Sequence, residues 1–147
     1  MIGGLVIRGW AAGQLQKNKE LTVSGPYAHT RNPLYLGSLL IGLGVTAAGG
    51  LPIFALIFSV FFLLVYKRTM DLERRYLSDR FGEQYDRYQE SVPLFFPRLQ
   101  PYSPPPEFGH TATRFSLDRY VKNKEWEAAL GAVLGLGFLA AKAGGAF

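Results

Sequence analysis

A cluster of polar and charged side chains stands directly before a long apolar segment of the chain. Its members are Tyr27, His29, Thr30 and Arg31. Together they offer a phenol, an imidazole, a hydroxyl and a guanidinium for hydrogen bonds and ion pairs. Two interpretations follow. The cluster is either an interfacial loop with aromatic and cationic anchors, or a pocket for a polar or charged small molecule.

Two turn signals bound this cluster and place it at the start of a helix. Gly25-Pro26 and Asn32-Pro33 each contain a proline, which fixes its own φ and keeps the preceding residue out of the helical region. Pro33 can also begin a helix, because its missing N–H would have no partner in the first turn. Residues 21–37 are thus predicted to join a basic loop to the opening of an apolar helix.

Composition excludes several classes of site. The 147-residue chain has no cysteine, so it has neither disulfides, thiolate metal ligands nor a cysteine nucleophile. His29 and His110 lie far apart in the sequence, and we expect no metal site. Very apolar blocks alternate with highly charged ones at a net charge of +5, which is typical of a small membrane protein. The positive charge forms no stripe on a polar domain, so a nucleic-acid partner is not expected.

Two uncharged apolar segments, residues 34–48 and 51–66, are predicted to form a transmembrane hairpin. The turn between them contains two glycines and a proline. The first segment presents glycines and the second phenylalanines, and such small and bulky faces pack well in lipid. A buried hairpin of a soluble protein is the alternative interpretation. Residues 1–16 are apolar and glycine-rich despite Arg8, and we expect a membrane or interfacial helix there.

Beyond the hairpin the chain becomes charged, then proline-rich, then apolar again. Residues 67–88 show helical spacing of apolar side chains with an interruption at Gly82, which predicts an amphipathic helix. Residues 93–113 are predicted to form an extended strap across the mouth of the helices. Six apolar side chains are expected to dip into that mouth: Leu94, Phe95, Phe96, Leu99, Tyr102 and Phe108. A last helix at 126–142 is predicted to pack through Gly131, Gly135 and Gly137.

The sequence thus predicts the all-α class. The expected architecture is a polytopic helical membrane protein with a central transmembrane hairpin, a cytoplasmic amphipathic helix and a C-terminal membrane helix. Of 16 lysines and arginines, 14 fall in residues 17–31 and 67–124. The positive-inside rule assigns this side to the cytoplasm, so the regions Leu21–Pro33 and Lys67–Lys124 are predicted to be cytoplasmic.

Two motifs resemble those of a known family. The first joins Gly25-Pro26-Tyr27, Arg31-Asn32-Pro33, Tyr35 and Gly37; the second runs from Glu73 through Leu77, Phe81-Gly82, Tyr85 and Tyr88 to Val92-Pro93. In this order they resemble the isoprenylcysteine carboxyl methyltransferase and phospholipid methyltransferase group of integral membrane enzymes. The resemblance divides the chain into a methyltransferase-like membrane core (1–98), the proline-rich part of the strap that lies beyond this core (99–113), and an interfacial segment with the C-terminal membrane helix (114–147).

The resemblance implies that S-adenosylmethionine binds between the first motif and the charged helix, and that its methyl group passes to a lipophilic carboxylate or amine. Arg31 would bind the cofactor's carboxylate and Glu73 its ammonium, which makes these two the candidate catalytic residues. The implied cofactor-binding residues are Gly25, Pro26, Tyr27, Arg31, Asn32, Pro33, Tyr35, Gly37 and Glu73. The implied partners are membrane lipids and the lipophilic acceptor.

Two positions depart from the family's motifs. Asn32 stands where the family has a histidine, and Arg74 where it has a second glutamate. Because the cofactor is cationic, we expect Arg74 to weaken its binding unless the side chain points away. The departures favour an alternative function: a non-catalytic subunit of a larger membrane complex that keeps the methyltransferase scaffold and binds lipids or hydrophobic pigments. Sterol reductases have a distantly similar arrangement, but this chain has no evident phosphate-binding glycine pattern.

Overall fold

The computed structural model describes residues 1–16, 19–108 and 113–144, and every regular element there is a helix. The elements are α1 (Ile2–Gln14), the 3₁₀ turn η1 (Gly25–Ala28), α2 (Pro33–Ala48), α3 (Pro52–Phe81), α4 (Glu83–Ser91), the 3₁₀ turn η2 (Pro106–Phe108), α5 (Leu117–Lys122) and α6 (Glu125–Ala143). The predicted all-α class is confirmed. His110 lies outside the described residues, as do positions 109–112 of the predicted strap.

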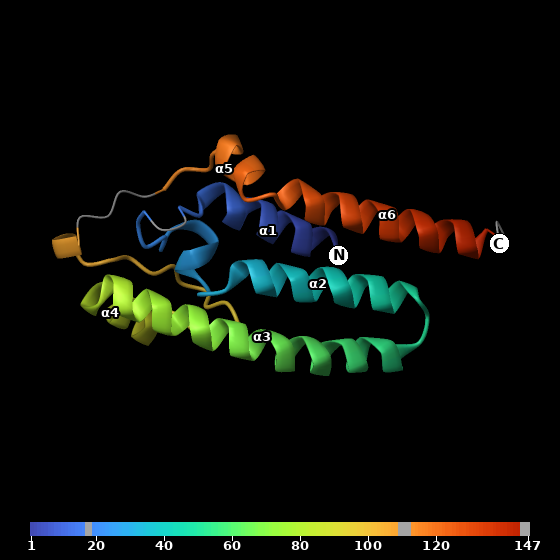
Figure 1. The fold of residues 1–147 in the computed structure, drawn as a ribbon, viewed down its shortest axis with the longest axis horizontal. Coiled ribbons are helices and arrows are strands. Elements are labelled where there is room, and N and C mark those ends of the chain that lie inside the picture. Colours follow the sequence, from blue (N-terminus) through green and yellow to red (C-terminus); the bar gives the residue numbers. More distant parts are fainter. Residues whose placement is uncertain (17–18, 109–112, 145–147) are drawn as a thin grey trace.

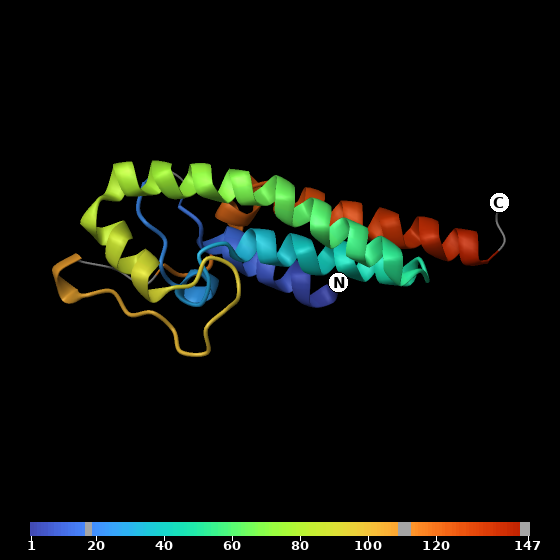
Figure 2. The ribbon, with the colours of Figure 1, turned by 90° about the horizontal axis from the view of Figure 1, so that it is seen from below.

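Four helices, α1, α2, α3 and α6, run along the long axis of the molecule and alternate in direction (Figure 1). The turn between α2 and α3 lies at one end, and η1 and α4 lie at the other (Figure 2). We call the part built from residues 19–35 and 70–108 the loop end. The part built from residues 40–65 and 128–144 is the hairpin end.

Glycines let α2 approach its neighbours closely. A Cβ built on Gly37 would lie 2.7 Å from the carbonyl oxygen of Gly4 and 2.5 Å from Cγ of Arg8. No residue larger than glycine therefore fits at the crossing of α1 and α2 without a shift of its neighbours. A Cβ on Gly42 would clash with the ring of Phe58 on α3. The expected packing of a glycine-lined helix against a phenylalanine-lined one is confirmed.

The third helix is longer than the predicted membrane segment. α3 has 30 residues and runs without a break from the apolar stretch into the charged one. It ends at Gly82, whose φ of +53° is unfavourable for residues with a side chain. α4 then folds back beneath it (Figure 2). The predicted interruption at Gly82 is confirmed, and the charged half of α3 is rigidly continuous with its apolar half.

Membrane association rests on the apolar half of α3. Among the described helices, α3 is the one that is long and apolar enough to cross a membrane, and only 11% of its apolar window is buried inside the protein. The core helix of a soluble protein would be mostly buried, so this exposure favours contact with lipid. α2 is apolar but shorter. Helix length and composition therefore do not establish the polytopic topology, which stays a prediction.

The strap pairs with the loop that carries the first motif. Three backbone hydrogen bonds join them, each from an N–H to a carbonyl oxygen: Arg31 to Pro93 (3.0 Å), Arg98 to His29 (2.9 Å) and Tyr102 to Ala28 (2.9 Å). Phe95 is buried, but Phe96 and Leu99 are 79% and 96% exposed. The expectation that all six apolar side chains dip into the helices is wrong for these two. Neighbouring side chains of an extended chain lie on opposite faces, which explains why Phe96 is exposed next to the buried Phe95. The exposure of Leu99 does not follow from this alternation.

The last helix is present as predicted, but it packs differently. A Cβ on Gly131, Gly135 or Gly137 would meet no atom of the described chain within 4 Å. Packing through these glycines is therefore wrong. α6 is held at its beginning instead, where the Glu125 side chain is buried. The remainder of α6 exposes much of its apolar surface.

Candidate functional site

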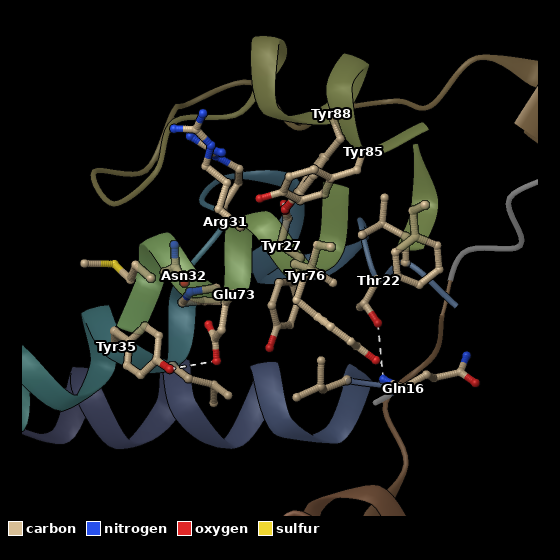
Figure 3. Close-up of a pocket in the computed structure, with 18 of the residues that line it drawn as sticks. Gln16, Thr22, Tyr27, Arg31, Asn32, Tyr35, Glu73, Tyr76, Tyr85 and Tyr88 are labelled. Carbon is tan, nitrogen blue, oxygen red and sulfur yellow. Dashed lines mark hydrogen bonds between the residues drawn. The ribbon is translucent and has the colours of Figure 1, made fainter. Parts of the chain in front are cut away.

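The first motif and the charged half of α3 border one cavity of about 460 Å³. α1 and α4 complete its walls, and the start of α6 reaches it through Glu125. Figure 3 shows the side chains that converge on this cavity. Its size is typical of sites for small molecules and cofactors.

Most of the predicted cofactor-binding residues line the cavity: Tyr27, Arg31, Asn32, Pro33, Tyr35 and Glu73. Gly25, Pro26 and Gly37 do not, and they shape the surrounding backbone instead. Gly25 has a φ of +57° and leaves room for the side chain of Gln14. Pro26 is buried in η1, and Gly37 lies at the crossing of α1 and α2. Their place in the motif is explained by conformation and close packing.

Arg31 brings an unpartnered cation to the cavity. Its backbone N–H donates to the carbonyl oxygen of Pro93. The Nε and Nη1 atoms of its side chain are buried and have no hydrogen-bond partner among the described residues. Leaving a buried donor unsatisfied costs about 1–3 kcal/mol. A ligand with an anionic acceptor group would remove this cost.

Glu73 lies on another side of the same cavity. Figure 3 shows it beside Tyr35, with Arg31 nearer to Tyr88. The Tyr35 hydroxyl donates to Oε1 of Glu73 at 2.8 Å. No ion pair joins Glu73 to Arg31 in the described part of the chain. Two opposite charges therefore line one cavity without neutralising each other.

The two departures from the family's motifs have different structural outcomes. The Asn32 side chain donates from Nδ2 to the carbonyl oxygen of Leu94 at 3.0 Å, so it fastens the motif loop to the strap. Arg74 is exposed and lines the cavity next to Glu73. An additional cationic residue therefore borders the cavity beside Glu73.

Tyrosines form much of the cavity wall. Tyr27, Tyr85 and Tyr88 are buried, and the Tyr88 hydroxyl donates to the carbonyl oxygen of Tyr27 at 2.6 Å. Burial raises the pKa of Tyr27 and of Tyr88, so both phenols are neutral at physiological pH. The wall thus offers uncharged aromatic faces, which suit a planar ring.

A charged pair that was not predicted from the sequence also lies at this cavity. Arg8 of α1 donates from Nε and Nη2 to the two carboxylate oxygens of Glu125, each at 2.8 Å. Its Nη1 donates to the carbonyl oxygen of Leu34 (3.2 Å) and to the hydroxyl of Ser38. The side chains are 20% and 6% exposed. Arg8 is the lone charge of an apolar helix, and that was the signal that could have revealed it.

The sequence model of the phospholipid methyltransferase family matches residues 2–84. This match covers more than half of the chain and includes α1, the first motif, the hairpin and Glu73. The protein belongs to the phospholipid methyltransferase family, as its motifs predicted.

Three curated relatives illustrate this kinship. The cobalt-zinc-cadmium resistance protein CzcN of Cupriavidus metallidurans is 33% identical over 81% of this chain and 54% of its own length. The nickel-cobalt-cadmium resistance protein NccN of Alcaligenes xylosoxydans is 36% identical over 57% and 39%. The protein-S-isoprenylcysteine O-methyltransferase of Schizosaccharomyces pombe is 30% identical over 60% and 37%. The chain thus spans about half or less of each relative.

No solved structure matches the chain. Within the described ranges, no group of three or more histidine, cysteine, aspartate or glutamate side chains is placed to hold a metal ion.

Proposed function

We propose that this protein binds S-adenosylmethionine in the cavity and transfers its methyl group to a lipophilic acceptor. The observation that carries the proposal is the placement of Arg31 and Glu73, which line one cavity with opposite and unpaired charges. A methyl donor that is itself an amino acid has a carboxylate and an ammonium, and it needs such a pair of partners. The similarity to a protein named as a methyltransferase supports the same reaction.

The cavity residues fit this cofactor. Arg31 would donate to the carboxylate from its unpartnered Nε and Nη1 atoms. Glu73 would accept from the ammonium while Tyr35 holds one of its oxygens in place. The neutral faces of Tyr27 and Tyr88 would contact the adenine.

The chemistry supplied by S-adenosylmethionine is a methyl group on a positively charged sulfur, open to displacement. The protein's part is alignment and the exclusion of water. Arg31 and Glu73 would fix the position of one end of the ligand through charge-assisted hydrogen bonds. The buried tyrosines would keep water from the reacting atoms. The exposed apolar face of α3 would let the acceptor arrive from the bilayer.

Calorimetry on the detergent-purified full chain tests the proposal. S-adenosylmethionine and its demethylated product should both bind. The variants Arg31→Gln and Glu73→Gln should each weaken binding by about tenfold or more, as expected for the loss of a charged hydrogen bond. Arg75→Gln is the matched control, because this arginine is exposed and does not line the cavity. No heat from a folded protein at high ligand concentration would contradict the proposal.

We also propose that Leu21–Pro33 and Lys67–Lys124 face the cytoplasm, since most lysines and arginines lie there. The chain has no cysteine, so single-cysteine variants report one position each. Lys19→Cys and Arg75→Cys should react with an impermeant reagent from the cytoplasmic side, and Gly50→Cys from the opposite side. Equal labelling of all three from one side would contradict this topology.

A non-catalytic subunit is the second candidate. Arg74 favours it, because this arginine adds positive charge where a cationic cofactor would bind. Exposed apolar faces on α3 and α6 would then bind lipids, hydrophobic pigments or other membrane subunits. Isolation from native membranes separates the candidates. Stoichiometric larger partners without S-adenosylmethionine binding would support the subunit, and a lone small particle that binds the cofactor would contradict it.

A further inference from the structure

Two large apolar side chains of the strap lie on the surface of the protein, close to a cation. Phe96 is 79% exposed and Leu99 is 96% exposed. Pro97 and Arg98 stand between them. The segment that matches the family ends at residue 84, so the match does not account for these side chains. Apolar groups of this size gain free energy when they leave water, and the fold does not bury them.

Phe95 fixes the height of this part of the strap along the helices. Its side chain is buried in one cluster with Phe62 and Met70 of α3. Those two residues lie about 12 Å apart along the helix axis, at ~1.5 Å per residue. Tyr66, midway between them, packs against the same cluster, and Lys67 is the first charge after the apolar half of α3. The strap therefore crosses α3 at the level where its apolar half ends.

Two tyrosines mark the same level. The ring centroids of Tyr35 and Tyr66 are 4.8 Å apart, and both side chains pack against the cluster that contains Phe95. The Tyr35 hydroxyl donates to Glu73 on the charged half of α3. Tyrosines are enriched at the two surfaces of a bilayer, because the ring is apolar and the hydroxyl is polar. The level of Phe95 thus has the composition of a membrane–water interface.

Arg98 adds positive charge to the exposed segment. Its Nη1 donates to the carbonyl oxygen of Ser91 at 2.6 Å. No ion pair joins its guanidinium to an acidic side chain in the part of the chain that the structure describes. Its backbone N–H donates to His29, and Figure 2 shows this part of the strap beside η1. The protein therefore holds the backbone of Arg98 in place but does not neutralise its charge.

We propose that residues 96–99 dock on the surface of a phospholipid bilayer. Phe96 and Leu99 insert at the boundary between headgroups and acyl chains, beside the exposed apolar half of α3. Arg98 binds the phosphate of a phospholipid headgroup, since the cation lies between the two inserted side chains. The pairing of the strap with the motif loop already holds the segment at this level. The contact is independent of S-adenosylmethionine and of methyl transfer.

Fluorescence quenching by lipids measures this contact on the full chain in nanodiscs of phosphatidylcholine and phosphatidylglycerol. The chain has no cysteine, so Phe96→Cys and Leu99→Cys each carry one fluorophore. A nitroxide on the acyl chain, close to the headgroup, should quench both labels several-fold more than a label at Glu107→Cys. Glu107 is the matched control, because it is exposed on the same strap and η2 lies at the far end of the loop end (Figure 1).

A label at Leu64→Cys reports whether α3 is in the bilayer, since Leu64 is 70% exposed on its apolar half. If this label is quenched, but those at positions 96 and 99 are quenched no more than the one at 107, the proposal is wrong. Iodide, a quencher dissolved in water, should show the reverse order. Labels at 96 and 99 that neither quencher reaches would place a second copy of the chain there, which also overturns the lipid contact. So would an unquenched label at Leu64→Cys.

The headgroup contact is tested with Arg98→Gln in the Leu99→Cys chain. One arginine near an anionic membrane surface changes a binding equilibrium about fivefold, so the label should leave the lipid about fivefold more readily. Arg98→Lys keeps the charge and should keep the quenching. Arg75→Gln, an exposed arginine outside the strap, controls for a general loss of charge. Quenching that is unchanged by Arg98→Gln, or lost equally in Arg98→Lys, would overturn the headgroup contact.

Discussion

At the loop end, groups from distant parts of the chain are joined by hydrogen bonds, whereas the hairpin end packs glycines of one helix against apolar side chains of its neighbour. Tyr88 reaches the backbone of Tyr27, and Thr30 donates to the carbonyl oxygen of Phe95 at 2.9 Å. At the hairpin end, Leu64 is 70% exposed and Leu134 is 64% exposed. The first region joins its backbone polar groups to one another, with the Arg31 guanidinium as the exception, and the second exposes apolar surface.

This difference shows which surroundings each region requires. Polar backbone in loops must find partners, and at the loop end the chain supplies them. A soluble protein rarely exposes a large continuous apolar patch, so the hairpin end needs lipid or an apolar partner around it. Arg8 and Glu125 lie where the two regions meet.

The largest effect is expected at the boundary. Arg8→Gln should lower the free energy of unfolding by about 3–5 kcal/mol, because it leaves the Glu125 carboxylate buried without its partner. Chemical unfolding in detergent, followed by circular dichroism, measures this. The double variant with Glu125→Gln should recover most of the loss. A single variant as stable as Arg75→Gln would show that the pair is not needed to hold α6.

The same substitution should have opposite signs at two glycines. Gly37→Ala should destabilise by about 1–3 kcal/mol, because its Cβ would overlap α1. Gly137→Ala, on the open part of α6, should stabilise by about 0.5–1 kcal/mol through helix propensity alone. Paired unfolding curves in the same detergent test this contrast. Two losses of similar size would mean that α6 is packed on both faces.

Removal of one hydroxyl at the loop end should cost more stability than a substitution on the exposed face of the hairpin end. Tyr88→Phe should cost about 1–3 kcal/mol, since it leaves the buried carbonyl of Tyr27 without its donor. Phe61→Leu, at a position 64% exposed on α3, should change stability by less than about 0.5 kcal/mol. Comparable values for the two variants would contradict the view that polar contacts stabilise only the loop end.

Alkaline pH should weaken the loop end selectively. Burial raises the pKa of Tyr27 and Tyr88, so the folded state keeps protons that the unfolded chain loses above about pH 10. Their contribution is complete below that pH and declines as pH rises, by at most ~1.4 kcal/mol per pH unit for each group. Unfolding midpoints measured from pH 8 to 11 should fall more steeply for wild type than for Tyr88→Phe. Identical slopes would contradict the assignment.

Local patterns predicted the parts of the fold that depend on neighbours in sequence. The hairpin, the break at Gly82 and the motif loop follow from turn residues and helical spacing. The Arg8–Glu125 pair was not predictable in this way, because its members are 117 residues apart. Nor does sequence distinguish Gly37, which packs against a neighbour, from Gly131, which leaves a hollow. Both are glycines in apolar helices, and the path of another helix decides the outcome.

The pairing between the strap and the motif loop affects the order of assembly. The N–H of Arg31 and the carbonyl oxygens of Ala28 and His29 receive their partners only from residues 93–102, which are synthesised after α1, α2 and α3. The helices can therefore be in the membrane while the loop between them is still unpaired, and the arrival of the strap fixes the wall of the cavity. A cut near the exposed Leu99 would release that wall while leaving every helix covalently intact, so the shape of the cavity would change before helix content is lost.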